Sequence, residues 1–167
     1  MTIHSDHPFV PPEGERDGLR RLRGRLSAPV TIVATDAERG RVGLTVSSLV
    51  VVHGEPARLL LVLDPDSGLA EALRPGGSAA VSLLEPGDEF LAEVFAGLAP
   101  APGGTFTVGD WTDSPWGPHL RGRSWCGARI DETRPLGWSV EVLATVEEVR
   151  IDGPGGLTHA RGRYRAP

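Results

Sequence analysis

A chain of 167 residues with a formal net charge of −5 is long enough for one domain with a hydrophobic core. The charge argues against a nucleic-acid binder, which would present a basic surface, and the absence of an apolar run of about 18 residues argues against a membrane protein. Glycine (22) and proline (15) are frequent, which favours a β-rich fold with many tight turns. The single cysteine, Cys126, excludes an internal disulfide and a thiolate metal cluster.

The first fifteen residues are polar and lack the hydrophobic segment of a secretory leader, so we expect 1–15 to be a flexible tail of a cytoplasmic protein. The remaining residues, 16–167, are expected to form one domain. This domain would begin with an amphipathic helix over 16–26, because leucines recur at helical spacing and arginines occupy the other side. The basic side is either a solvated face or a phosphate-binding surface.

Apolar and β-branched runs separated by turn sequences predict strands in the rest of the chain. Short helices are expected at 69–73 and 88–95, and the segment 98–118, rich in Pro, Gly and Trp, has no regular pattern. Most links are too short for parallel crossovers, so the pattern predicts a mainly β, largely antiparallel barrel with two or three short helices. The expected strands cover 30–36, 42–52 with an interruption at the two serines, 57–64, 78–84, 125–130, 138–149 and 157–164.

Five short segments, taken in order, resemble a known family. They are Gly43–Ser48 followed by Pro56, Leu61–Ser67, Leu91–Gly97, Trp116–Leu120 and Gly162–Tyr164. The chain resembles the flavin reductase-like, FMN-binding split-barrel proteins, which include the reductase components of two-component monooxygenases. The resemblance covers roughly 19–164 and implies a split β-barrel.

The first of these segments implies one wall of a flavin-binding groove. Thr45, Val46, Ser47 and Ser48 would offer backbone N–H groups and hydroxyls to the acceptor atoms along one edge of the isoalloxazine ring. Read without the resemblance, the two serines would instead mark a β-bulge or a half-exposed strand.

The resemblance also implies a place for the flavin phosphate. Asp64 and Ser67 belong to a loop that contacts the flavin in relatives, and Ser67 would lie near the phosphate as the N-cap of the short helix that follows. The same stretch is also good turn sequence. Arg163, in the last strand, would face either the phosphate or the solvent.

Two departures from the family pattern bear on activity. Asp66 stands where relatives usually carry a basic residue, and its carboxylate would repel a phosphate. The segment 134–138 has no histidine, whereas many relatives have one there, near the flavin and the nicotinamide. Hydride transfer is chemistry of the cofactors, so this absence does not exclude activity. Trp138 would either stack on a ring or pack in the core at the end of the barrel.

The resemblance implies an NAD(P)H:flavin oxidoreductase that binds FMN, or alternatively FAD, and supplies reduced flavin to a partner monooxygenase. A homodimer is expected because the family is usually dimeric. Two alternatives stay open: a non-catalytic protein that binds a flavin or another cofactor, and a relative whose groove takes a different ligand. No catalytic residue is predicted, and the scattered His53, His119 and His159 predict no metal site.

Overall fold

The computed structural model describes residues 13–167, with side chains from Gly18 onwards. Residues 1–12 of the expected tail lie outside the described residues. The first helix, α1, spans Glu13–Arg25, so it begins three residues before the predicted start at Arg16. No helix in this described part of the chain is long and apolar enough to cross a membrane.

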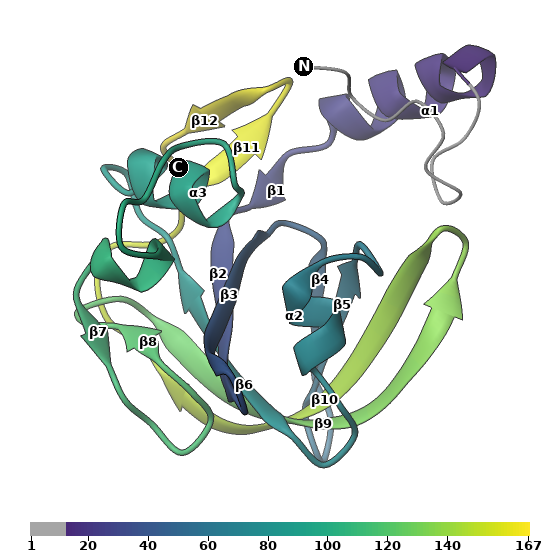
Figure 1. Cartoon of the computed structure of the whole chain (residues 1–167). Coiled ribbons are helices and arrows are strands. Elements are labelled where there is room, and N and C mark those ends of the chain that lie inside the picture. Colours follow the sequence, from purple (N-terminus) through teal and green to yellow (C-terminus); the bar gives the residue numbers. More distant parts are fainter. Residues whose placement is uncertain (1–12) are drawn as a thin grey trace.

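The centre of the fold is a seven-stranded antiparallel sheet with the strand order β3-β2-β6-β9-β10-β5-β4. Its two longest strands, β9 and β10, form a hairpin that curves along the bottom of the half-barrel in Figure 1. The strands are β2 Thr31–Ala37, β3 Gly40–Val46, β4 Leu49–Val52, β5 Arg58–Leu63, β6 Ser78–Leu83, β9 Trp125–Leu136 and β10 Ser139–Arg150.

Consecutive strands β3 and β4 form the two opposite edges of this sheet. Only Ser47 and Ser48 connect them, so the sheet has to curl until its edges approach each other at this dipeptide. Figure 1 shows the resulting half-barrel, with helix α2 (Gly68–Ala72) lying between the two edges. The predicted mainly β, largely antiparallel split barrel with short helices is confirmed, as is the interruption at the two serines.

Aliphatic side chains fill the inside of the half-barrel. Along β5 every second residue is buried and the residues between them are half-buried. The alternation shows that β5 turns one face to the core and leaves the other face partly exposed. The buried side chains of this core are Val33, Val46, Leu59, Leu61, Leu63, Leu69, Leu73, Ala79, Val81, Ala128, Ile130, Val142 and Ala144.

A second core lies under helix α3 (Glu89–Phe95) and the segment that follows it. Here Phe95, Phe106 and Trp111 form an aromatic cluster with ring centroids 4.9 to 5.2 Å apart. The segment 98–118, predicted to be irregular, is thus packed onto the sheet by its aromatic side chains. Its short elements are η1 Thr105–Thr107 and β7 Trp111–Thr112, which pairs with β8 His119–Leu120.

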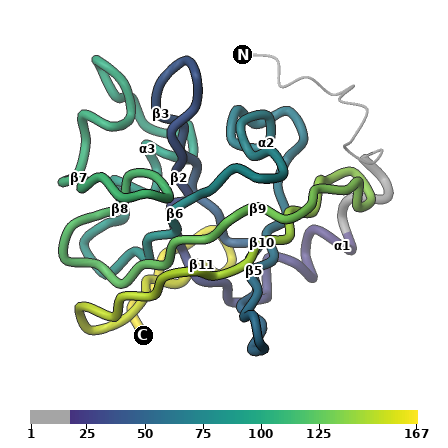
Figure 2. Tube along the Cα trace, turned by 90° about the horizontal axis from the view of Figure 1, so that it is seen from below, coloured from purple at the N-terminus to yellow at the C-terminus, as the bar shows by residue number. Residues whose placement is uncertain are grey.

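Three short strands form a separate sheet with the order β1-β11-β12. Figures 1 and 2 both show β11 apart from α2, on the same side of the molecule as α1. The strands are β1 Ala28–Pro29, β11 Thr158–Ala160 and β12 Arg163–Arg165. The predicted strand over 157–164 is therefore two short strands joined by a tight turn.

Candidate functional site

The split between β3 and β4 brings together two segments that the sequence analysis singled out. The backbone carbonyl of Ser48 accepts a hydrogen bond from the N–H of Val62, at 2.9 Å. Strand β5 ends one residue later, and the loop 64–67 leads from it into α2. The serine dipeptide and this loop therefore lie side by side at the opening of the half-barrel.

The four residues of the first segment play different roles. The hydroxyl of Thr45 donates to the carbonyl of Ala92 in α3, at 2.7 Å, and Val46 is buried with its carbonyl bonded to the hydroxyl of Thr31. Ser47 and Ser48 are half-buried, and their hydroxyls make no hydrogen bond to the described residues. These two hydroxyls are thus available to a ligand, whereas Thr45 and Val46 hold the strand in place.

The loop 64–67 is closed by its own hydrogen bonds. The hydroxyl of Ser67 donates to the carbonyl of Asp64 at 2.7 Å and accepts from the N–H of Ala70 at 3.2 Å. A carboxylate oxygen of Asp64 accepts from the N–H of Asp66 at 2.9 Å. Ser67 is therefore the N-cap of α2, as predicted, and a bond to a phosphate would compete with the bonds it already makes.

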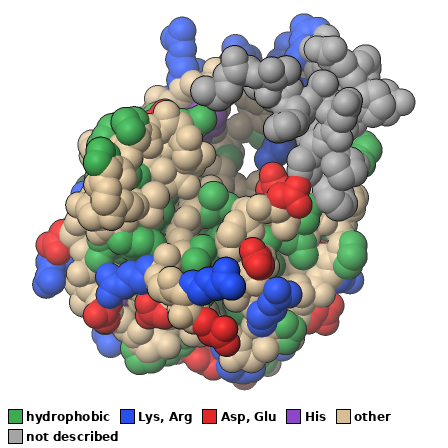
Figure 3. Space-filling view, viewed as in Figure 1, with side chains coloured by type: hydrophobic (Ala, Val, Ile, Leu, Met, Phe, Trp, Pro, Cys, Tyr) green, Lys and Arg blue, Asp and Glu red, His purple; other side chains and the backbone are tan. Residues whose placement is uncertain are grey.

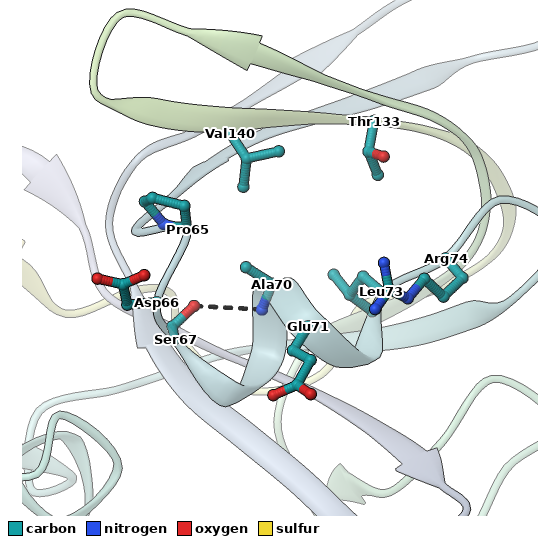
Figure 4. Close-up of a pocket in the computed structure, with 9 residues that line it drawn as sticks. All are labelled: Pro65, Asp66, Ser67, Ala70, Glu71, Leu73, Arg74, Thr133 and Val140. Atoms are coloured by element: carbon teal, nitrogen blue, oxygen red, sulfur yellow. Dashed lines mark hydrogen bonds between the residues drawn. The ribbon is translucent and has the colours of Figure 1, made fainter. Parts of the chain in front are cut away.

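A pocket of about 450 Å³ opens beside this loop. Figure 4 shows Thr133 and Val140 of the β9–β10 hairpin on one side and α2 on the other. Asp66 and Glu71 bring carboxylates to the pocket, and Arg74 brings a guanidinium to its other end. The volume falls in the range of about 300 to 1,000 Å³ that small-molecule sites occupy. The lining residues are Pro65, Asp66, Ser67, Ala70, Glu71, Leu73, Arg74, Thr133 and Val140.

Sequence reasoning missed the contribution of Arg74 to this pocket. A signal was present, because Arg74 is the only arginine between Arg58 and Arg121 and directly follows the short helix of the loop. The contributions of Thr133 and Val140 had no local signal, since they depend on the register of the β9–β10 hairpin.

Arg163 does not join the other predicted residues. It is exposed, lies in β12 of the separate three-stranded sheet, and pairs with Ala160. Figure 1 shows β12 well away from α2 and the loop that carries Ser67. Of the predicted cofactor-binding residues, the structure therefore groups Thr45, Val46, Ser47, Ser48, Asp64 and Ser67, and leaves Arg163 apart.

Trp138 lies in the turn of the β9–β10 hairpin and is 44% exposed. The interpretation of Trp138 as a core residue at the end of the barrel was therefore wrong, because the hairpin extends beyond the core. Near this turn, Arg134 and Glu141 form an ion pair across the two strands, at 2.7 Å. Stacking of Trp138 on a ring stays a prediction.

The other candidate side chains are held by packing. His119 stacks on Trp125 with ring centroids 3.9 Å apart, and His159 packs edge-on against Tyr164. Burial raises the pKa of the Cys126 thiol to about 11, so the thiolate nucleophile is disfavoured at neutral pH. Among residues 13–167, no group of three His, Cys, Asp or Glu side chains could hold a metal ion.

Residues 23–167 match the model of the family described as the flavin reductase like domain. The chain belongs to this flavin reductase-like family. Among curated relatives, it is 38% identical to the FMN reductase (NADH) RutF of Ancylobacter novellus, over 93% of this chain and 87% of the relative. It is 26% identical to the 4-hydroxyphenylacetate 3-monooxygenase reductase component of Pseudomonas aeruginosa, over 92% of this chain and 93% of the relative.

Solved structures of flavin reductase-like proteins have the same fold. The NADH:FAD oxidoreductase SgcE6 of Streptomyces globisporus superposes with a TM-score of 0.79 at 26% identity, covering 93% of this chain and 95% of that chain. The flavin reductase PheA2 superposes with a TM-score of 0.81 at 17% identity, covering 89% of this chain and 95% of that chain. The resemblance stated from the five sequence segments is thereby confirmed at the level of family and fold.

Proposed function

We propose that this protein is an NAD(P)H-dependent flavin reductase that binds FMN at the split of its half-barrel. The observation that carries the proposal is the match to the flavin reductase-like family over 23–167, which includes every residue at the split. The relative named FMN reductase (NADH), 38% identical over most of both chains, supports FMN as the flavin and NADH as the donor.

The residues at the split fit a flavin. An isoalloxazine ring carries hydrogen-bond acceptors along one edge, and Ser47 and Ser48 have hydroxyls without partners among the described residues. The ribityl arm and its phosphate would extend into the pocket beside Ser67, where Arg74 supplies a positive charge. Asp64 would hold the loop in shape through its bond to the N–H of Asp66.

A flavin held at the split would supply the redox chemistry that links a nicotinamide donor to the final electron acceptor. The side chains described here do not have to donate or accept that hydride. The two serines orient the ring by hydrogen bonding, and the aliphatic core beneath them keeps water away from one side of the site. The missing histidine at 134–138 is therefore compatible with turnover.

Reduced flavin would be supplied to a partner monooxygenase in the cytoplasm. The relative that is the reductase component of a 4-hydroxyphenylacetate 3-monooxygenase supports such a partner. FAD remains the alternative flavin, since the structurally similar SgcE6 is named for FAD.

We also propose a homodimer, because α1 carries an uncovered apolar stripe. Leu19 and Leu22 lie on one face of α1 and Leu26 directly follows the helix, and the three side chains are 57 to 63% exposed. On a different face of the helix, the carbonyl of Gly24 is bonded to the N–H of Arg161. The helix therefore contacts its own chain through the face that carries Gly24, and its leucine face is open to a second copy of the protein. Sedimentation equilibrium would test for this dimer.

The test of the reductase function mixes flavin-stripped protein with NADH and either FMN or FAD. Loss of the near-ultraviolet absorbance of NADH should depend on both protein and flavin, with turnover on the order of 1 to 10³ per second. The variant carrying Ser47→Ala and Ser48→Ala should need more FMN for half-maximal rate. Wild-type protein that gives no flavin-dependent oxidation of NADH or NADPH would refute the proposal.

A second candidate is a flavin-binding protein without reductase activity. The segment 134–138 favours it, because it lacks the histidine that many relatives have near the flavin and the nicotinamide. The same assay separates the two candidates, since flavin fluorescence quenching without NADH oxidation would select this one.

A further inference from the structure

Strand β3 leads directly into the serine dipeptide of the split, and it is an edge strand whose one neighbour in the main sheet is β2. Residues along a strand alternate between its two faces. Figures 1 and 2 both show α3 on one side of β3 and α2 on the other. The inner face packs into the core of the half-barrel with Val42, Leu44 and Val46. The outer face, turned toward α3, carries Arg41, Gly43 and Thr45.

Aromatic side chains lie directly against this outer face. An added Cβ at Gly43 would lie 2.7 Å from Cε1 of Phe95 and 3.0 Å from Cζ of Phe106, so both rings touch the bare backbone of β3. The two rings pack edge-on, with their centroids 5.0 Å apart. Arg41 pairs with the carboxylate of Asp113, and its guanidinium carbon lies 6.0 Å from the centroid of the Phe106 ring. The segment 98–118, which carries Phe106 and Asp113, thus contacts β3 at two positions of one face.

The third residue of the outer face lies closest to the split. The hydroxyl of Thr45 donates to the carbonyl of Ala92, a buried residue of α3, at 2.7 Å. Thr45 precedes Ser47 by two residues, so this bond holds the backbone just before the dipeptide. Closely packed interiors transmit strain, so a shift of the groups on the outer face would move the end of β3 and the two serines with it.

The segment 98–118 is itself held by packing. Figure 3 shows that the surface over α3 and this segment consists mainly of hydrophobic and uncharged groups, with charged side chains gathered below it. The side chains of the segment that lie against the second core are Ala99, Ala101, Phe106, Val108 and Trp111. The segment therefore forms a firm support for β3, whose backbone pairs with a strand on one side only.

We propose that Phe106 is a positioning residue of the flavin site, acting through the outer face of β3 on Ser47 and Ser48. The inference rests on the proposed function, since binding of the flavin at the split is what would depend on Phe106. Phe106 lies against the face of β3 opposite to the core of the half-barrel, so it acts without touching the flavin. The segment 98–118 would thereby fix the edge strand that backbone pairing leaves free on one side.

The test compares Phe106→Leu with Phe90→Leu in the full-length protein, by titrating FMN and following its fluorescence. Phe106→Leu removes the ring that lies against Gly43, so FMN binding should weaken about threefold or more. Phe90 lies in α3 with its side chain 58% exposed, so Phe90→Leu is the matched control and should bind FMN as the wild type does. The titrations are made well below the melting temperature, because lower stability does not change the affinity of a protein that stays folded.

A second pair of variants tests the anchor nearest the split. Thr45→Val removes the hydroxyl that bonds to Ala92 and should weaken FMN binding to a similar extent. Thr45→Ser keeps a hydroxyl at this position and should restore the affinity of the wild type. Hydrogen exchange over 43–48, measured by mass spectrometry without flavin, should be faster in Phe106→Leu and Thr45→Val than in the wild type.

The inference is overturned if Phe106→Leu binds FMN as tightly as the wild type, if Phe90→Leu weakens binding as much, or if exchange over 43–48 is unchanged in Phe106→Leu. Wild-type protein that binds no FMN would refute the proposed function instead. In that case, faster exchange over 43–48 in Phe106→Leu would still support the positioning of β3 by Phe106, because this readout needs no flavin.

Discussion

The side of the molecule around α3 and the split around α2 use their polar groups in opposite ways. Around α3, the carboxylate of Asp88 accepts from the guanidinium of Arg123 at 2.7 and 2.9 Å and from the N–H of Glu85 at 2.9 Å. At the split, the hydroxyls of Ser47 and Ser48 have no partner among the described residues. Polar groups that are hydrogen-bonded within the protein fix its local geometry, so we call the side around α3 the scaffold. Polar groups without a protein partner at an opening can bind a ligand, so we call the split the site.

The largest effect is expected from Gly117→Ala on the scaffold side. An added Cβ would lie 2.8 Å from the carbonyl oxygen of Ala34 and 3.0 Å from the Cα of Thr35, both in the backbone of β2, and φ is +130°. We expect a loss of about 3 kcal/mol in the free energy of unfolding, measured by urea denaturation. Gly137→Ala is the control, with φ +57° and no atom within 4 Å of the added Cβ, and should cost about 1 kcal/mol. Equal losses would show that the close approach to β2 is unimportant.

A smaller effect is expected from Asp88→Asn. The amide keeps one acceptor oxygen and loses the charge, so Arg123 loses its charge-assisted pair and stability should fall by about 2 kcal/mol near neutral pH. Burial raises the pKa of Asp88, but the bonds from Arg123 and the Glu85 N–H outweigh it and hold the pKa below 3.8. The wild-type advantage should therefore be complete above the unfolded value of 3.8 and shrink as the pH falls below it. If the stability difference between the wild type and Asp88→Asn stayed the same well below pH 3.8, the ion pair of Asp88 with Arg123 would not be its cause.

The smallest effects on stability are expected within the split. There, one serine variant should lose stability, and two others should lose FMN affinity instead. Ser67→Ala removes the N-cap of α2 and should cost about 1 kcal/mol of stability. Ser47→Ala and Ser48→Ala should each change stability by less than about 0.5 kcal/mol, yet weaken FMN binding about tenfold, which corresponds to 1.4 kcal/mol. Unfolding curves and flavin titrations on the three variants give both quantities. If Ser47→Ala and Ser48→Ala lost stability and kept their FMN affinity, the two serines would have a structural role and would not bind the flavin.

Much of the fold was predictable because its signals are local. The interruption at Ser47 and Ser48 was visible as a polar pair inside an apolar run, and the capping role of Ser67 follows from the order of residues at the start of a helix. The family was recognisable from five short segments for the same reason, since each specifies a turn, a cap or a break in a strand. These features depend on residues that are close together in the chain, so they can be predicted without the tertiary structure.

The features that local sequence did not indicate depend on contacts between distant segments. Nothing near Trp138 in the chain indicates that the β9–β10 hairpin extends past the core, and nothing near Arg163 indicates that β12 joins a separate sheet. The curling of the main sheet likewise follows from β3 and β4 being placed at opposite edges, which is settled by strand pairing across the whole chain. Local sequence thus specified the strands, turns and family of this protein, while long-range pairing determined which of the candidate residues meet, because only pairing brings residues far apart in the chain into contact.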